Sequence, residues 1–254
     1  MTQTPLLPGA VGLTHLRVYD TAGPDGLHGG SPHVHFACTE CYYVERGRGR
    51  VQTLSAEGYH EFALTPGRVV WFSPGVIHRL VNEDKLEILV VMQNSGLPEG
   101  GDFVLTMPQS ILRDPESYFE LASLSARGEV FASGIDAAYR RRDVSVQGFA
   151  ELRSRVGEEG LGALREFYES ALKLVQPKLP NWKPVWRDGP LAAATATGEQ
   201  LEALQKGDVS HLLEGAARAM APQDERRLGV CGTLGRYLPE GVSITPQAPL
   251  AEPR

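Results

Sequence analysis

The sequence predicts a mainly β fold: a small β-barrel followed by a mostly α-helical C-terminal region. Up to about Met92, short runs of β-branched and aromatic residues are separated by Gly, Pro, Asp and Asn, which is typical of sandwiches and barrels. Beyond this point, apolar residues recur at three- and four-residue steps, which indicates amphipathic helices. The Gly-rich stretch 94–101 is a candidate linker. We therefore expect a barrel at residues 1–95 and a helical region at 96–254, whose role the sequence leaves open.

The expected strands are short and closely spaced. Each is bounded by turn residues, and Gly47, Gly67, Gly75 and Asn82 suit the tight turns that a closed barrel needs. The strands are expected at residues 13–19, 33–36, 40–44, 50–54, 59–64, 68–72 and 86–92.

Local signals place helices in the second part. Asp114 followed by a proline and an acid predicts a capped helix start. An apolar stripe within 161–175 predicts an amphipathic helix. A capping box at residues 197–200 predicts another helix start, and a further apolar stripe lies at 212–220. The proline-rich stretch 176–190 is expected to be an irregular, packed connection between helices.

Charge and cysteine content argue against several classes of protein. The formal charge is −6, and no Lys/Arg-rich run offers a surface to nucleic acid. No apolar stretch approaches the roughly 20 residues that span a bilayer, so no membrane partner is expected. Three cysteines do not make a secreted disulfide framework, and residues 1–9 are a poor signal peptide. We therefore expect a cytoplasmic protein whose partner is a small-molecule ligand.

A pair of histidines at alternate positions is the most informative motif. In an extended strand, His33 and His35 point to the same side. Glu40 follows closely, and His78 returns from a later strand. Three imidazole nitrogens and one carboxylate oxygen suit a first-row divalent metal and leave positions for exchangeable ligands. The alternative interpretation is a pair of surface histidines on an edge strand, with an unrelated third histidine.

The same residues resemble the two signatures of the cupin superfamily, G-x5-H-x-H-x3-4-E-x6-G and G-x5-P-x-G-x2-H-x3-N. All four ligand positions of these signatures are filled by the expected residue types. The matching residues are His33, His35, Glu40 and Gly47 in the first signature, and Gly67, Gly75, His78 and Asn82 in the second.

Two turn positions depart from these signatures. Leu27 stands in place of the first glycine, and Ser73 stands in place of the proline, which follows as Pro74. The resemblance covers about a third of the chain. It implies a jelly-roll barrel in which the three histidines and Glu40 bind the metal. The common ions of the family are Mn, Fe, Ni, Zn and Cu, which agree with this ligand set, whereas Ca and Mg prefer oxygen ligands.

Residues close to the predicted ligands are candidates for substrate binding. Tyr42 lies two positions after Glu40 and is expected to face the same cavity. Arg17, Trp71 and Gln93 lie in or next to expected strands, where they could orient a ligand. For each of them, a core or solvated position is the alternative.

A C-x-x-C motif, formed by Cys38 and Cys41, spans Glu40. A redox pair or competing thiolate ligands is one interpretation, and two small strand residues is the other. Alternation turns Cys41 away from any site that Glu40 faces, and no helix N-terminus is expected here. We therefore favour two small strand residues.

Four functions fit these features. The first is a metalloenzyme, dioxygenase-like or decarboxylase-like, that acts on a small oxygen-rich metabolite. The second is a non-catalytic binding protein or sensor. The third is a sugar isomerase, which would want more cationic groups for a phosphate, and the fourth is a metal that only stabilises the barrel. The resemblance also implies that barrels pair through their sheets, so we expect a homodimer.

Overall fold

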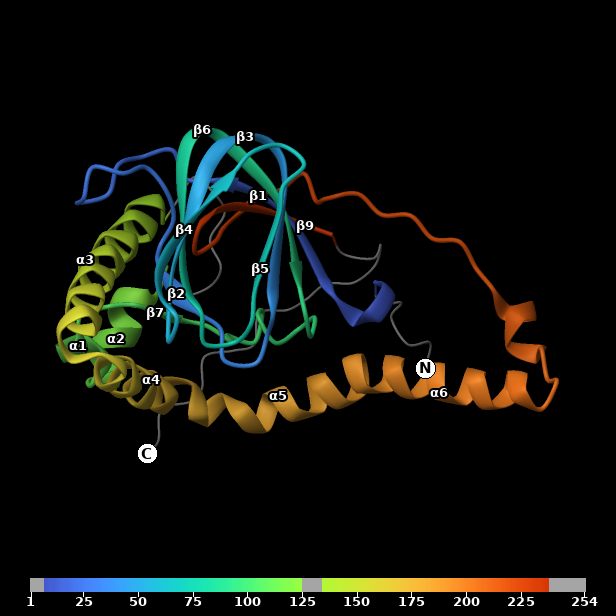
Figure 1. Cartoon of the computed structure of the whole chain (residues 1–254). Coiled ribbons are helices and arrows are strands. Elements are labelled where there is room, and N and C mark those ends of the chain that lie inside the picture. Colours follow the sequence, from blue (N-terminus) through green and yellow to red (C-terminus); the bar gives the residue numbers. More distant parts are fainter. Residues whose placement is uncertain (1–6, 125–133, 238–254) are drawn as a thin grey trace.

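The computed structural model describes residues 7–124 and 134–237 of the chain. Figure 1 shows a barrel of strands with helices at its side, and a long helical arm that runs beneath it. The strands are β1 (Gly12–Val18), β2 (His33–Val34), β3 (Glu40–Ser55), β4 (Gly58–Leu64), β5 (Val69–Phe72), β6 (Ile77–Met92), β7 (Val104–Leu105), β8 (Arg227–Leu228) and β9 (Gly232–Arg236). The α-helices are α1 (Gln109–Leu112), α2 (Pro115–Ala122), α3 (Ile135–Glu159), α4 (Leu161–Val175), α5 (Leu179–Trp186) and α6 (Ala192–Gln205).

All the described strands join one antiparallel sheet, in the order β4-β3-β6-β1-β9-β8. Three short strands branch from it: β5 pairs with β3, and β2 pairs with both β6 and β7. The inward faces of these strands carry the apolar side chains of the barrel core. The expected mainly β barrel followed by a helical region is therefore confirmed.

The long strands β3 and β6 form the centre of the barrel. Where the sequence predicts a turn at Gly47, the structure has bulges that bend β3 without ending it. Gly47 has φ of 78°, and a Cβ at this position would lie 2.3 Å from the carbonyl oxygen of Lys85. The two strands expected at 40–44 and 50–54 are therefore halves of one strand.

The sheet does not end at the boundary expected near residue 95. Strand β9 pairs with β1, from Thr14 opposite Arg236 to Val18 opposite Gly232. Strand β7 pairs with β2. The chain thus returns from the end of the helical arm to complete the barrel, as Figure 1 shows. Local patterns could not predict this return because β9 is short and rich in glycine.

Helix α3 is fastened to the barrel by close backbone packing. A Cβ at Gly148 would lie 2.2 Å from the carbonyl carbon of Met107, so only glycine fits here. Thr106 Oγ1 also donates a hydrogen bond to the carbonyl oxygen of Ser145, at 3.2 Å. Arg141 lies one turn before Ser145 and shares this inward face of α3.

The helix predictions are partly right. Asp114 caps α2 by accepting a hydrogen bond from the Glu116 N–H, and α4 covers the predicted stripe at 161–175. The stretch 176–190 is helical rather than irregular, and a wide π-type turn at Arg187–Leu191 accommodates its last proline.

Two predicted helix signals are wrong. The expected capping box at 197–200 lies inside α6, because the helix already starts at Ala192. The stripe at 212–220 forms only a short 3₁₀ turn, Ser210–Glu214, before the chain becomes extended. Leu212 and Leu213 are 60% and 87% exposed, so no packing partner stabilises a helix there. Within the described ranges, no helix combines the length and apolarity that a bilayer crossing requires.

Candidate metal centre

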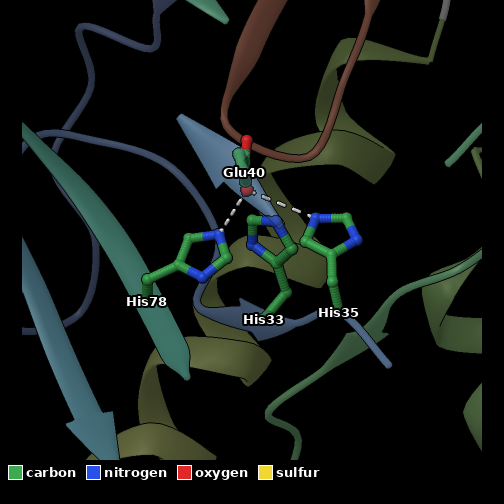
Figure 2. Close-up of side chains that lie close together, drawn as sticks. All are labelled: His33, His35, Glu40 and His78. Atoms are coloured by element: carbon green, nitrogen blue, oxygen red, sulfur yellow. Dashed lines mark ion pairs between the residues drawn. The ribbon is translucent and has the colours of Figure 1, made fainter. Parts of the chain in front are cut away.

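The four predicted ligands come together at one point inside the barrel. Figure 2 shows the three imidazole rings arranged around the carboxylate of Glu40. One possible ligand atom from each of His33, His35, Glu40 and His78 lies within 4.8 Å of the others. Each of the four residues is buried, with at most 7% of its surface exposed.

The strand register explains this convergence. His33 in β2 pairs directly with His78 in β6, and their ring centroids are 4.3 Å apart. His35 follows two positions after His33 and faces the same side, as alternation predicts. Glu40 is the first residue of β3, which pairs with the far end of β6 at Met92.

Each imidazole is oriented by a backbone carbonyl behind it. The Nδ1 atoms of His33 and His78 lie 3.0 Å from the carbonyl oxygens of Ser31 and Val76. His35 Nδ1 contacts the carbonyl oxygen of Asp102 in the same way. Because a carbonyl can only accept, each Nδ1 carries the proton and donates. Each Nε2 is thereby turned toward the centre, where its lone pair can bind a metal when the imidazole is neutral, as in metal-binding histidines.

Two of the buried atoms at the centre lack hydrogen-bond partners. Glu40 Oε2 lies 2.9 Å from His78 Nε2 and 3.3 Å from His35 Nε2. Neither Glu40 Oε2 nor His78 Nε2 forms a hydrogen bond. Since His78 Nδ1 carries the proton, its Nε2 and the carboxylate oxygen are two acceptors in contact. A cation shared by the two atoms removes this repulsion, so the residues fit a divalent metal.

The ionisation of the cluster suits metal binding. Burial holds the pKa of His33 well below 6.5, and His78 and His35 lower it further. Burial would raise the pKa of Glu40, but the neighbouring His78 and His35 outweigh it and hold this pKa well below 4.5. The imidazole of His33 is therefore neutral and the carboxylate of Glu40 is ionised at neutral pH.

A cavity of about 470 Å³ opens from the cluster. His33, His35 and Glu40 line it, whereas His78 is not part of the described lining and is 1% exposed. Much of the remaining wall is apolar. Its apolar side chains include Leu16, Val90, Met92, Phe103, Leu228, Val230 and Leu234.

Tyr42 is the one candidate substrate-binding residue that lines this cavity. It is fully buried, and its hydroxyl group has no hydrogen-bond partner. Burial, followed by the charge of Glu40, raises its pKa well above 10, so this hydroxyl is a permanent donor at neutral pH.

The other three candidates lie outside the cavity. Trp71 pairs with Cys41 on the outer face of the sheet and is 69% exposed, because alternation turns both away from Glu40. Arg17 contacts the carboxylate of Glu87 on the barrel surface. Gln93 is exposed and accepts a hydrogen bond from the Thr39 N–H.

The structure brings residues to the cavity that the sequence did not indicate. They come from beyond residue 96, because α3 and the β8–β9 hairpin form part of the wall. These residues include Glu99, Arg141, Arg227, Cys231 and Arg236. Arg141 stands in a run of three arginines, and nothing in the sequence shows which of them faces inward.

The cysteines near the site are free thiols. Cys38 is buried in the connection that precedes β3, and Cys41 is the half-buried second residue of β3. Neither cysteine lies at the N-terminus of a helix. Burial raises the pKa of both thiols, and Cys38 is raised further by Asp102. Both are therefore protonated at neutral pH, which disfavours the redox interpretation.

A sequence model described as the cupin domain matches residues 23–92, which hold all four cluster residues. This part of the chain is a cupin domain. No curated protein matches the chain.

Several solved structures match part of this chain at low similarity. A cupin protein from Bacteroides fragilis is 17% identical, with a TM-score of 0.25 over 34% of this chain and 65% of that chain. A TDP-fucose-3,4-ketoisomerase from Campylobacter jejuni is 8% identical, with a TM-score of 0.30 over 35% of this chain and 64% of that chain. A capsular polysaccharide assembling protein from Staphylococcus aureus is 16% identical, with a TM-score of 0.26 over 35% of this chain and 25% of that chain. This chain thus spans less than two thirds of each of these proteins, and the similarities bear on neither substrate nor reaction.

Proposed function

We propose that this cupin is a metalloenzyme that acts on a small oxygen-rich metabolite, with His33, His35, Glu40 and His78 as metal ligands. The observation that carries the proposal is the open side of the cluster. Three of the four ligands form part of a cavity wall, and the cavity is large enough for a metabolite. A purely structural metal is enclosed by its ligands, so this opening supports a catalytic or ligand-binding role.

The donor set favours a transition metal. Three imidazole nitrogens and one carboxylate oxygen suit Mn, Fe, Ni, Zn or Cu. Such an ion supplies Lewis acidity toward a bound oxygen, and redox chemistry if it is Fe, Mn or Cu.

The groups of the protein around the metal have separate roles in this proposal. The backbone carbonyls behind the imidazoles hold the rings in one tautomer and orientation. The hydroxyl group of Tyr42 is available to donate a hydrogen bond to an oxygen of the substrate, because no protein group accepts from it. The apolar walls exclude water and strengthen electrostatic contacts at the centre.

We favour dioxygenase-like or decarboxylase-like chemistry over sugar isomerisation. An isomerase moves protons and needs a positioned acid and base. The described lining of the cavity contains no imidazole other than His33 and His35. The apolar walls also match a partly hydrophobic metabolite better than a fully hydroxylated sugar.

This proposal is tested first by measuring the metal content of the protein and then by measuring turnover. Elemental analysis of protein purified without an affinity tag is expected to show about one transition-metal ion per chain. Thermal-shift screening of the metal-loaded protein then identifies ligands, which are assayed for O2 consumption and CO2 release. A metal-free protein that takes up no metal at neutral pH would contradict the proposal. Saturable ligand binding without turnover would replace it with the sensor function.

A further inference from the structure

A buried arginine from the helical region reaches the wall of the metal cavity. Arg141 lies on the inward face of α3, is 6% exposed and lines the cavity. Two of its nitrogens donate to backbone carbonyls, Nη1 to Ala122 at 3.1 Å and Nη2 to Gly229 at 2.6 Å. Its Nε has no hydrogen-bond partner. The guanidinium is therefore held in place but not fully satisfied.

No carboxylate in the part of the chain that the structure describes forms an ion pair with Arg141. The two tyrosines beside it, Tyr19 and Tyr118, are neutral at pH 7, because burial raises the pKa of both hydroxyl groups. Burial, for example, raises the pKa of Tyr118 to about 12. A second buried arginine shows the usual arrangement, because Arg79 pairs with both carboxylate oxygens of Asp25. An isolated buried charge is costly, so an anion is expected to supply the missing partner of Arg141.

The β8–β9 hairpin connects this arginine to the metal cluster. The carbonyl oxygen of Gly229 accepts from Arg141, and two residues later Cys231 Sγ lies 3.9 Å from Nδ1 of His33. The cluster and the guanidinium therefore face the same space from two directions.

The charge balance of the cavity is also positive. Arg141, Arg227 and Arg236 line it, and Nε of Arg236 is buried without a partner. The acids of the described lining are Glu40 and Glu99. Three guanidinium groups thus face two carboxylates, and one of these, Glu40, belongs to the cluster. A cavity whose lining carries a net positive charge concentrates anionic ligands.

We propose that Arg141 binds the carboxylate group of a small organic acid whose other end faces the metal cluster. The metal end of this assignment rests on the proposed function, whereas the contact with Arg141 does not. A carboxylate is favoured over a phosphate because two of the guanidinium nitrogens already donate to backbone carbonyls, which leaves few donors for a ligand. A planar, singly charged group needs fewer donors than a phosphate does.

Calorimetric titration of acid and amide pairs tests the assignment. The probes are benzoate with benzamide, succinate with succinamide, and inorganic phosphate, each titrated into metal-loaded and metal-free protein. At least one acid is expected to bind at least about tenfold more tightly than its amide, as a charge-assisted hydrogen bond requires. Equal affinity for acids and amides, or tighter binding of phosphate, would overturn the assignment.

Two matched variants locate the contact. Arg141→Met is expected to weaken binding of the acid about tenfold or more and to leave affinity for the amide unchanged. Arg140→Met removes an exposed arginine from the same helix and is expected to change neither affinity. Acid binding that is the same in Arg141→Met as in the wild type would overturn the assignment. If Arg141→Met does not fold, the comparison of acid and amide affinities in the wild-type protein still tests whether the cavity binds a carboxylate.

The metal-free titration separates this assignment from the proposed function. If the protein takes up no metal but still binds the acid in a way that depends on Arg141, the arginine contact is supported and only the metalloenzyme proposal is rejected. Full metal loading without any preference for acids leaves the metal centre in place and removes only the arginine contact.

Discussion

Asp102 holds His35 in position from a part of the chain beyond the cupin domain. Its main-chain carbonyl contacts Nδ1 of the imidazole, and its carboxylate accepts from the backbone N–H groups of Phe36 and Ala37. Asp102 is completely buried. A residue 67 positions away in sequence thus fixes both the ring and the backbone of one predicted ligand.

Replacing this carboxylate tests its role in positioning the metal ligand. Asp102→Ala leaves two partly buried N–H groups without acceptors, which costs about 1–3 kcal/mol of unfolding free energy. Metal affinity is expected to fall about 10–100-fold, as for other losses of groups that orient metal ligands. Asp102→Asn keeps one acceptor oxygen and is expected to lie between the wild type and the alanine variant. Competition with a chelator measures the affinity, and unchanged affinity in both variants would refute the positioning role.

Removing a ligand is expected to have a larger effect. His78→Ala should strip most of the metal, because one of the four proposed ligands is lost. It should also lower the melting temperature, because the bound ion stabilises the folded state. Cys41→Ser is the matched control, since this half-buried thiol points away from the cluster, and it should change neither quantity much. Elemental analysis and thermal unfolding provide both measurements. Full metal stoichiometry in His78→Ala would show that the cluster is not the metal site.

Metal binding is expected to weaken as the pH falls. Burial would lower the pKa of His35, but the hydrogen bond and charge of Glu40 outweigh it, so this pKa is raised in the metal-free protein. A metal ion must displace that proton, because only the deprotonated nitrogen binds metal. Below the raised pKa, affinity should therefore drop by up to about tenfold per pH unit for one proton. Titration of metal-free protein in several buffers measures the protons released, and release of none would contradict this prediction.

The ion pair between Arg79 and Asp25 predicts an acid-sensitive part of the fold. Burial would raise the pKa of Asp25, but hydrogen bonds and the charge of Arg79 outweigh it and hold this pKa below 3.8. The stabilising contribution is therefore fully present above 3.8 and is lost as the pH falls through the lower folded-state value. Asp25→Asn should lower stability by about 1–3 kcal/mol at neutral pH, since Arg79 stays buried. Its melting temperature should fall less than that of the wild type on acidification, and parallel curves would argue against the ion pair.

An apolar patch on the outer face of the sheet favours self-association. Trp71 and Val69 in β5 lie beside Cys41 and Tyr43 in β3, and Trp71, Val69 and Tyr43 are 69%, 48% and 43% exposed. Covering such a patch stabilises a dimer. Light scattering coupled to size-exclusion chromatography is expected to give a dimer for the wild type and more monomer for Trp71→Glu. A monomeric wild type would contradict the expectation of a homodimer.

The sequence alone determined the barrel and the four residues of the cluster. Strand alternation has a period of two, so the spacing of His33 and His35 already set their common direction, and Glu40 and His78 stood at the matching signature positions. Local helix signals worked where an amphipathic face is buried, as in α4, and failed at 212–220, where no packing partner is present.

Only the tertiary structure decided what surrounds the cluster. Trp71 was removed from the candidate substrate contacts because its strand partner faces outward, whereas Arg141 and Asp102 entered the site through long-range packing. A helix face and the short β8–β9 hairpin carry no local mark of which cavity they will line, because that depends on how distant segments pack. The predicted ligand positions therefore follow from spacing along the sequence, and the shape and charge of the cavity are properties of the whole chain.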